Sequence, residues 1–242
     1  MTMRRFISTY IRRAAISLLL LMVSSAVSAQ MKFFTLQKDS IPVFRGFAVS
    51  FDLVGAGLLA FSDNGQYEGA LRVNLHDEWF PIVELGLGKA NHSDDVTHIH
   101  YDTKAPYFRI GIDKNMLKDK HGNNRLYAGL RYAFTSYKVN IYRPVFEDPV
   151  WKWDTVYEIM DASCNQHWIE AVVGVDAKIF GPLHLGWSVR YKRRIAHSED
   201  GDFGRTWYVP GFGIYGDTRL GGTFNVIIDI WRTKNCYGNC LF

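Results

Sequence analysis

The sequence has few cysteines, and their number limits the disulfide and metal chemistry open to the chain. Cys164, Cys236 and Cys240 are the three cysteines among 242 residues. An odd number in an exported chain leaves at least one of them unpaired. Cys236 and Cys240 are close enough in sequence to form a disulfide in an oxidising compartment, and their redox state stays open. Two cysteines near a chain end are too few for a structural metal site.

The sequence also has little net charge and no long apolar run beyond its first 29 residues. The formal net charge is +4, and four of the arginines lie within the first 13 residues. The remaining chain is therefore close to neutral, which gives no support to a nucleic-acid partner. A transmembrane helix needs about 20 apolar residues in succession. The rest of the chain can therefore enter a membrane only as a β-barrel.

The N-terminus has the pattern of a secretory signal peptide. Arginines precede an apolar segment at residues 14–27, and Val27-Ser28-Ala29 forms a small-residue cleavage site. The apolar segment is too short for the alternative, a membrane anchor. The predicted organisation is a signal peptide at 1–29, a periplasmic lead-in at 30–43, an outer-membrane β-barrel at 44–232 and a C-terminal tail at 233–242.

The clearest pattern in the chain runs from His167 to Arg194. Two segments alternate between apolar and polar residues and are joined by a turn of three residues. Alternation with a period of two predicts two antiparallel strands, each with one apolar and one polar face. If both apolar faces point the same way, Glu170 lies opposite Lys192 and Lys178 lies opposite His184.

The same alternation recurs along the chain and predicts about eight antiparallel strands in one closed up-and-down barrel. Long loops are expected at residues 89–105, 142–166 and 196–221, whereas the connections at the other end are mostly short. Long loops at one end and short turns at the other are typical of outer-membrane barrels. Residues 207–215 either extend a strand or fold over the mouth.

The signal peptide, the alternating strands, the long loops and the segment Tyr208-Val209-Pro210-Gly211-Phe212-Gly213 resemble the domain-of-unknown-function 6048 family. This is a family of small outer-membrane barrels of Gram-negative bacteria, and the resemblance covers essentially the whole mature chain. It implies location in the cell outer membrane and insertion by the barrel-assembly machinery. The family has no assigned activity, so the resemblance implies no functional residue.

The polar faces of the strands decide between two kinds of barrel. A soluble lipocalin-like carrier keeps its apolar faces inside, whereas a membrane barrel turns them to the lipid. Uncharged apolar faces, and polar faces that mix both charge signs with glycine, favour the membrane barrel. An eight-stranded interior is just filled by side chains, so we expect a charged plug rather than the alternative, a narrow conduit. The predicted lumen charges are Asp52, Glu68, Arg72, Glu84, Arg109, Arg131, Glu170, Asp176, Lys178, Arg190 and Lys192.

Two predicted outer loops contain candidate binding residues. His92, His98 and His100 are weak candidates for metal ligands, because imidazole is a common ligand but their spacing matches no structural site. A solvated loop is the favoured interpretation. Trp151 and Trp153 share a face if their segment is extended, which would let them stack on a sugar or a partner protein. Rings at the lipid interface are the favoured alternative.

The sequence favours a non-enzymatic outer-membrane barrel with a structural, interaction or envelope-assembly role. Its expected partners are outer-membrane lipid and an envelope protein or glycan at the outer loops, and no cofactor is expected. A lipid-modifying enzyme remains the alternative. Ser163 with His167, or His197-Ser198-Glu199, supplies the residue types for acyl transfer, but proximity in sequence does not make a catalytic triad.

Overall fold

The computed structural model describes residues 42–147, 150, 152–199 and 206–232. The predicted signal peptide, the predicted tail and all of the predicted lead-in except Pro42 and Val43 lie outside the described residues. Trp151, Cys236 and Cys240 do so as well.

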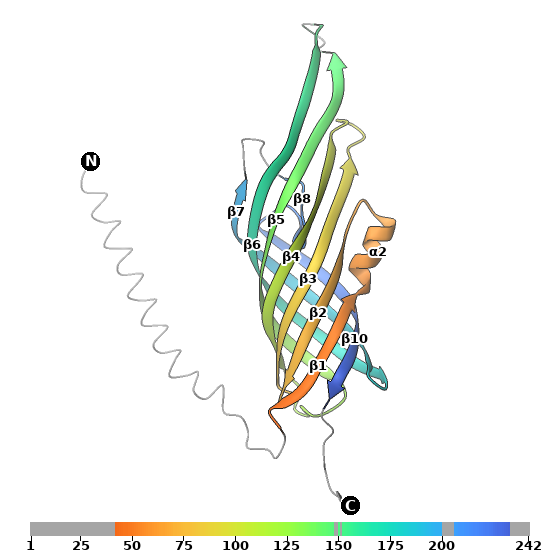
Figure 1. Ribbon diagram of the computed structural model, residues 1–242, viewed down its shortest axis with the longest axis vertical. Coiled ribbons are helices and arrows are strands. Elements are labelled where there is room, and N and C mark those ends of the chain that lie inside the picture. The colour runs from red at the N-terminus through yellow and green to blue at the C-terminus, as the bar shows by residue number, and fades with distance from the viewer. Residues whose placement is uncertain (1–41, 148–149, 151, 200–205, 233–242) are drawn as a thin grey trace, which may run out of the picture. The chain divides into compact units, whose positions relative to one another are not determined.

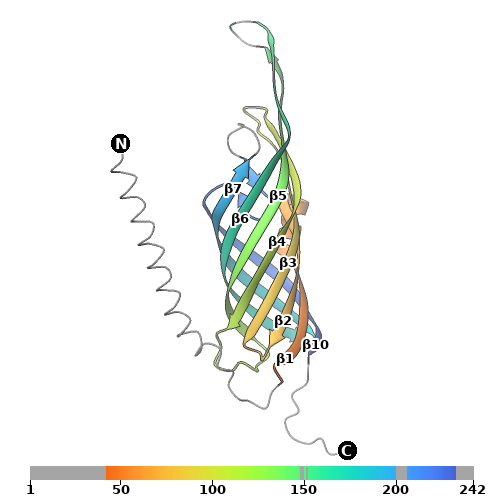
Figure 2. The same cartoon turned by 60° about the vertical axis from the view of Figure 1, so that its left-hand side comes forward.

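Eight antiparallel strands close into a barrel in the order β1-β10-β7-β6-β5-β4-β3-β2, which confirms the predicted fold class (Figures 1 and 2). Chain neighbours pair along most of the ring, and β1 closes it by pairing with both β2 and β10. The elements are β1 (Phe44–Asp52), α2 (Leu53–Phe61), β2 (Asn64–Leu75), β3 (Trp79–Ser93), β4 (His100–Asn115), β5 (Arg125–Glu147), β6 (Asp154–Phe180), β7 (Leu183–Glu199), β8 (Tyr208–Val209), β9 (Gly213–Ile214) and β10 (Thr218–Arg232).

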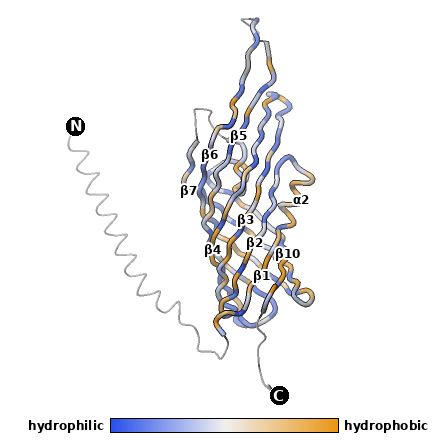
Figure 3. The backbone as a smooth tube through the Cα atoms, in the orientation of Figure 1, coloured by the Kyte–Doolittle hydropathy of each residue, from blue (hydrophilic) through white to orange (hydrophobic). Residues whose placement is uncertain are grey.

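The wall turns its apolar side chains outward and its polar side chains inward. On β6, Val173 and Val175 are about half exposed, whereas Glu170 and Asp176 are buried. The backbone tube alternates in hydropathy along the strands in the same way (Figure 3). A soluble carrier would have the reverse arrangement, with apolar side chains inside. This distribution contradicts the lipocalin-like alternative.

The predicted register of the β6–β7 hairpin is confirmed. Glu170 pairs with Lys192, and Lys178 pairs with His184. The turn itself is one residue shorter than expected, with Gly181 and Pro182 between the strands. A register shift between Lys178 and Phe180 accommodates the difference.

The outer connections are shorter than predicted because the strands continue into them. The loop expected at 89–105 is reduced to 94–99, and the loop expected at 142–166 is mostly strand. β5 and β6 pair with one another as far as Glu147 and Asp154 and rise beyond their neighbours (Figure 1). Register shifts and the left-handed φ of +56° at Asp161 interrupt the alternation here. The period-two pattern therefore did not reveal these strand ends.

Helix α2 is an element that the sequence pattern did not predict. It follows β1 directly, and the Asp52 side chain accepts hydrogen bonds from the N–H groups of Val54 and Gly55 at 3.1 Å each. Its nine residues are all apolar or glycine, so no polar face marks a helical period. In the described part of the chain, no helix is both long and apolar enough to cross a membrane.

The segment at 207–215 folds over the mouth of the barrel. The short strands β8 and β9 pair with each other and form a sheet separate from the barrel. Val209 and Phe212 are buried, and the Phe212 ring meets the Trp168 ring edge-on with 5.7 Å between centroids. The long loop expected at 196–221 thus contains a compact mouth segment.

The outward apolar wall predicts a position-dependent response to charge. Val173 and Val145 are similarly exposed, at 56% and 59%, but Val173 lies on the barrel wall and Val145 on the protruding hairpin. We expect Val173→Arg to lower the free energy of unfolding by about 2–4 kcal/mol, because a lipid-facing charge near the bilayer midplane carries that cost. Val145→Arg should change it by less than about 0.5 kcal/mol, as is usual at a solvated surface. Denaturant unfolding in lipid vesicles measures both, and equal effects would contradict a lipid-facing wall.

Candidate functional site

Strand alternation brings most of the predicted lumen charges into the barrel. Ten of the eleven are buried, with exposed fractions of 7% or less: Asp52, Glu68, Arg72, Glu84, Arg109, Arg131, Glu170, Asp176, Arg190 and Lys192. They come from seven of the eight barrel strands. The interior is therefore a polar core shared by strands around most of the ring.

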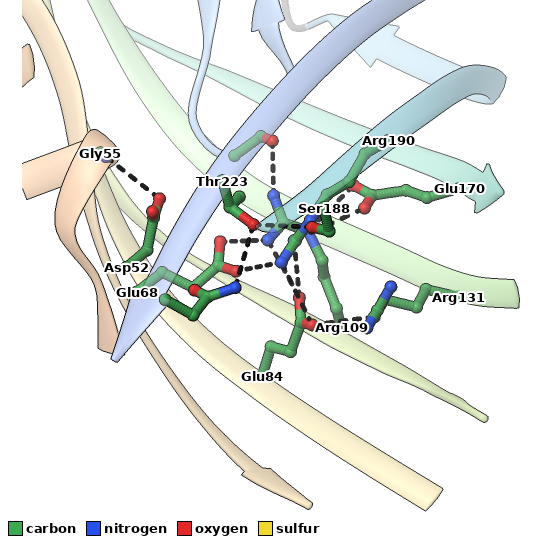
Figure 4. Close-up of polar contacts among 12 residues, drawn as sticks. Asp52, Gly55, Glu68, Glu84, Arg109, Arg131, Glu170, Ser188, Arg190 and Thr223 are labelled. Carbon is green, nitrogen blue, oxygen red and sulfur yellow. Dashed lines mark hydrogen bonds and ion pairs between the residues drawn. The ribbon is translucent and has the colours of Figure 1, made fainter. Parts of the chain in front are cut away.

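Glu84 on β3 is the central carboxylate of this interior. Its oxygens lie 2.8 Å from Arg131 Nε, 2.9 Å from Arg190 Nη1 and 3.2 Å from Arg109 Nη1. These three arginines come from β5, β7 and β4, so the ion pairs cross the barrel (Figure 4). Burial would make each charge costly alone, and mutual pairing compensates that cost.

Glu68 on β2 forms a second bridge across the interior. It pairs with Arg109 and lies 2.9 Å from Arg190 Nη2. The Tyr107 hydroxyl donates a hydrogen bond to the same carboxylate at 2.6 Å. Glu68 therefore links β2 to β4 and β7 across the interior.

Glu170 on β6 is fully buried and completes the central cluster. One of its oxygens lies 2.9 Å from Arg109 Nε and accepts a hydrogen bond from Trp168 Nε1 at 2.6 Å. Its other oxygen lies 3.8 Å from Arg190 Nη1. Glu170 thus shares two arginines with Glu68 and Glu84.

A further cluster contains two carboxylates. Asp176 lies 2.6 Å from Arg72 Nη1 and 3.2 Å from Arg125 Nη2. Asp113 lies 3.1 Å from Arg131 Nη2 and 3.6 Å from Arg72 Nη2. Arg131 therefore connects this cluster to Glu84.

Several members of the network were absent from the sequence-based set. Asp113 lies four residues after Arg109 on β4 and therefore points inward as Arg109 does. The alternation of that strand could have predicted it. Arg125 begins β5, and Arg45 near the start of β1 pairs with Asp77 of the β2–β3 turn at 3.0 Å. Pairing between a turn and a strand end has no signal in a period-two pattern.

Two predicted network residues have other roles. Lys178 is exposed beside the β6–β7 turn and is not part of the interior, because it lies beyond Arg125 and Asp176, the last pair between β5 and β6 at this end. Asp52 is buried but makes no ion pair with the described residues. It caps α2 and accepts a hydrogen bond from Phe224 N of β10 at 3.2 Å.

The mouth segment is bound to the charged interior through its backbone. Lys192 Nζ donates to the Gly211 carbonyl at 2.6 Å, and Arg109 Nη2 donates to the same oxygen at 2.8 Å. The Tyr101 hydroxyl donates to the Tyr208 carbonyl at 2.7 Å. Cationic groups of the interior thereby hold the segment across the opening.

Glycine permits this close fit. Gly211 has a φ of +80°, and a Cβ there would lie 2.5 Å from the Tyr107 ring. A Cβ at Gly88 on β3 would lie 2.8 Å from Pro210 Cα. Side chains at these positions would push the mouth segment out of the barrel.

The interior has little free space. A cavity beside Glu68, Glu84, Arg131 and Arg190 measures about 10 Å³. That volume admits about one water molecule. The ion pairs and the mouth segment therefore fill the described interior, and the geometry suits a plug better than a conduit.

The histidine candidates for metal binding do not converge. The structure shows no group of three or more His, Cys, Asp or Glu side chains with metal-binding geometry among its described residues. His92 Nδ1 lies 3.0 Å from an Asp63 oxygen, and the His100 ring packs on Tyr142 at 4.6 Å. His98 lies in the β3–β4 turn with a φ of +55°.

Asp94 organises that turn. One carboxylate oxygen accepts hydrogen bonds from Thr97 N at 2.7 Å, Thr97 Oγ1 at 2.9 Å and Val96 N at 3.0 Å. These donors, Thr97 N–H foremost, hold the pKa of Asp94 below its usual value. The carboxylate is therefore engaged in turn formation.

The residues considered for acyl transfer also lie apart. Ser163 and His167 are four positions apart on β6, which separates them by about 13 Å along a strand. His167 Nδ1 is instead within 2.7 Å of the Tyr132 hydroxyl. His197 and Ser198 are adjacent on β7 and point to opposite faces. Neither set has the geometry of a triad.

Trp153 is exposed at 63% beyond the end of the barrel wall. Its predicted partner Trp151 lies outside the described residues, so their common face stays a prediction.

These features define an outer-membrane β-barrel: a closed antiparallel ring, an apolar outer wall and a polar interior. The chain belongs to the family described as a domain of unknown function (DUF6048), whose model matches residues 11–230.

Two solved structures resemble the chain. One is a major outer membrane protein from Thermus thermophilus, with 12% identity, a TM-score of 0.41 and coverage of 76% of this chain and 98% of that chain. Another is Ail, the attachment invasion locus protein of Yersinia pestis, solved with the heparin analogue sucrose octasulfate. It has 10% identity, a TM-score of 0.37 and coverage of 77% of this chain and 94% of that chain. No curated protein sequence matches.

The buried network predicts a large cost for removing one carboxylate. Glu170→Leu should lower the free energy of unfolding by about 3–5 kcal/mol, because the buried Arg109 loses one of its three carboxylate partners and Trp168 Nε1 loses its hydrogen-bond acceptor. As a control, Lys138→Met removes the exposed Lys138–Asp161 pair, which measures 3.3 Å, and should cost less than about 1 kcal/mol. Denaturant unfolding of both variants in vesicles compares them. A Glu170→Leu effect as small as the control would contradict a stabilising network.

Proposed function

We propose that this protein is a non-enzymatic outer-membrane barrel that binds a partner protein through its β5–β6 hairpin, while its filled interior serves as a rigid support. The single observation that carries the proposal is the extension of β5 and β6 beyond the barrel wall. Outer-membrane lipid surrounds the apolar wall, and the barrel-assembly machinery is the partner during insertion.

The hairpin leaves its neighbours before it ends. β4 pairs with β5 as far as Tyr142, and β7 pairs with β6 as far as Cys164. Within the described chain, residues 143–147 therefore pair only with β6, and residues 154–163 pair only with β5. Each strand has one open edge, and an open edge is a template for a strand of another protein.

Apolar side chains on this hairpin are exposed where lipid does not reach. Val145, Val150, Trp153, Tyr157 and Met160 are between 41% and 75% exposed. The end of a barrel with the longer connections faces the cell exterior. A contiguous group of apolar side chains exposed to water marks a protein–protein interaction site. Together with the open edges, they favour an extended protein segment as the partner.

The interior supports the same function by fixing the base of the hairpin. β5 and β6 contribute Arg131, Glu170 and Asp176 to ion pairs with other strands. A rigid base lowers the entropy that binding must overcome, because the binding element is already ordered.

A photo-crosslinking experiment tests the proposed partner site. A photoreactive amino acid replaces Trp153, which is 63% exposed on the hairpin, or Trp187, which is 70% exposed on the barrel wall. We expect a discrete protein adduct from position 153 in intact cells and lipid adducts alone from position 187. Mass spectrometry identifies the adducts. Glycan adducts alone, or no protein adduct from position 153, would contradict a protein-binding hairpin.

A conductance measurement tests the structural interior. Protein inserted in a planar bilayer should give no stable current steps, because ion pairs and the mouth segment fill the lumen. Detergent alone is the control for leakage. Reproducible steps from the folded protein would contradict the plug and favour a conduit.

A further inference from the structure

Three lysines form a row across the outward face of the neighbouring strands β3, β4 and β5 (Figure 2). Lys89 on β3 pairs directly with Lys104 on β4. The β4–β5 register is the same on both sides of Lys104 and places it opposite Lys138 on β5. All three lysines are exposed, whereas the residues before and after each of them are buried. Their side chains therefore point outward together, and we call them the lysine row.

The lysine row lies at the outer edge of the apolar wall. On β4, every outward side chain between Lys114 and Lys104 is apolar. Ten residues of a strand rise about 33 Å, and a tilt of about 40° reduces this to about 25 Å along the membrane normal. That height matches the apolar band of an outer-membrane barrel. Lys104 is at the end of the band nearer the protruding β5–β6 hairpin, which places it at the level of the outer lipid headgroups (Figure 2).

Protein side chains compensate only part of this charge. Lys138 Nζ lies 3.3 Å from Asp161 Oδ1, whereas Lys89 and Lys104 make no ion pair with the described residues. Neither pairs with Asp102, which lies two positions further out on β4. Like charges directly opposite each other on a sheet destabilise it. Two adjacent positive charges are therefore available to an anionic ligand.

The spacing and charge of the row suit a phosphate monoester. Neighbouring strands are about 4.8 Å apart, so the long side chains of Lys89 and Lys104 can reach one phosphate group. A lysine ammonium binds phosphate as a point charge with three donors. A phosphate monoester carries a charge of about −1.5 to −2 at pH 7 and can neutralise both lysines, whereas a phosphodiester carries a single charge.

We propose that the lysine row binds a lipid of the outer leaflet whose headgroup carries a phosphate monoester. Lys89 and Lys104 contact the phosphate, and Lys138 adds a third positive charge beside them. A membrane lipid is preferred to a free phosphate ion because Leu87 and Pro106, paired with each other one step nearer the membrane centre, are apolar and exposed. The site is on the barrel wall and does not depend on the proposed partner of the hairpin.

Native mass spectrometry of the full chain in a neutral detergent tests this site. The probes are phosphatidic acid, a phosphate monoester, and phosphatidylglycerol, a phosphodiester, with the same acyl chains. We expect phosphatidic acid to bind several-fold more tightly, because its phosphate carries more charge. Lys104→Gln should weaken binding of phosphatidic acid about fivefold, as expected for the loss of one cation at a lipid surface. Lys104→Arg keeps the charge and should keep most of the binding.

The matched control is Lys178→Gln, which removes an exposed lysine beside the β6–β7 turn and should leave binding unchanged. Equal losses for Lys104→Gln and Lys178→Gln would overturn the proposal in favour of unspecific charge attraction. Equal affinity for the two lipids would overturn the assignment of a phosphate monoester. Displacement of phosphatidic acid by an equal concentration of inorganic phosphate would overturn the lipid assignment. Unchanged binding in a variant with both Lys89→Gln and Lys104→Gln would overturn the site altogether.

Discussion

Neutralisation of charge inside a closed ring is the constraint on which the structure depends. An eight-stranded barrel leaves room for side chains and little else, so each buried carboxylate needs cationic partners from other strands. Glu84 has three such partners, from β4, β5 and β7. These contacts form only if every contributing strand is in register. The interior therefore specifies how the ring is assembled as well as stabilising it.

Some of the same charged groups also bind the mouth segment at the outer end of the barrel. Arg109 forms ion pairs with Glu68, Glu84 and Glu170. It also donates a hydrogen bond to the Gly211 carbonyl of the mouth segment. Lys192 makes the second contact to that carbonyl. Arg109 thus takes part both in the ion pairs of the interior and in binding the mouth segment. Outside the interior and the mouth segment, exposed apolar side chains lie on the protruding hairpin and on α2.

Much of the wall could be predicted because a strand needs only a period of two to define its faces. The register of the β6–β7 hairpin followed from that period and a short turn, although the turn proved to be one residue shorter. Ten inward charges followed from the same parity. Helix α2 could not be predicted in this way, since Leu53–Phe61 has no polar face. The outer ends of β5 and β6 were also missed, because a left-handed residue at Asp161 and register shifts break the alternation.

The sequence by itself predicted a closed membrane barrel and the two faces of each strand, because these depend on local periodicity and composition, and the signal peptide, the strand and loop pattern and the Tyr208–Gly213 segment carried the resemblance to the family. Only the tertiary structure decided which charges meet, that Asp52 caps a helix, and that residues 207–215 close the mouth. It also decided that, in the run Lys192-Arg193-Arg194, Lys192 points inward and donates to the mouth segment, whereas Arg194 pairs with Asp217. These outcomes depend on contacts between residues far apart in the chain, and ring closure brings those residues together.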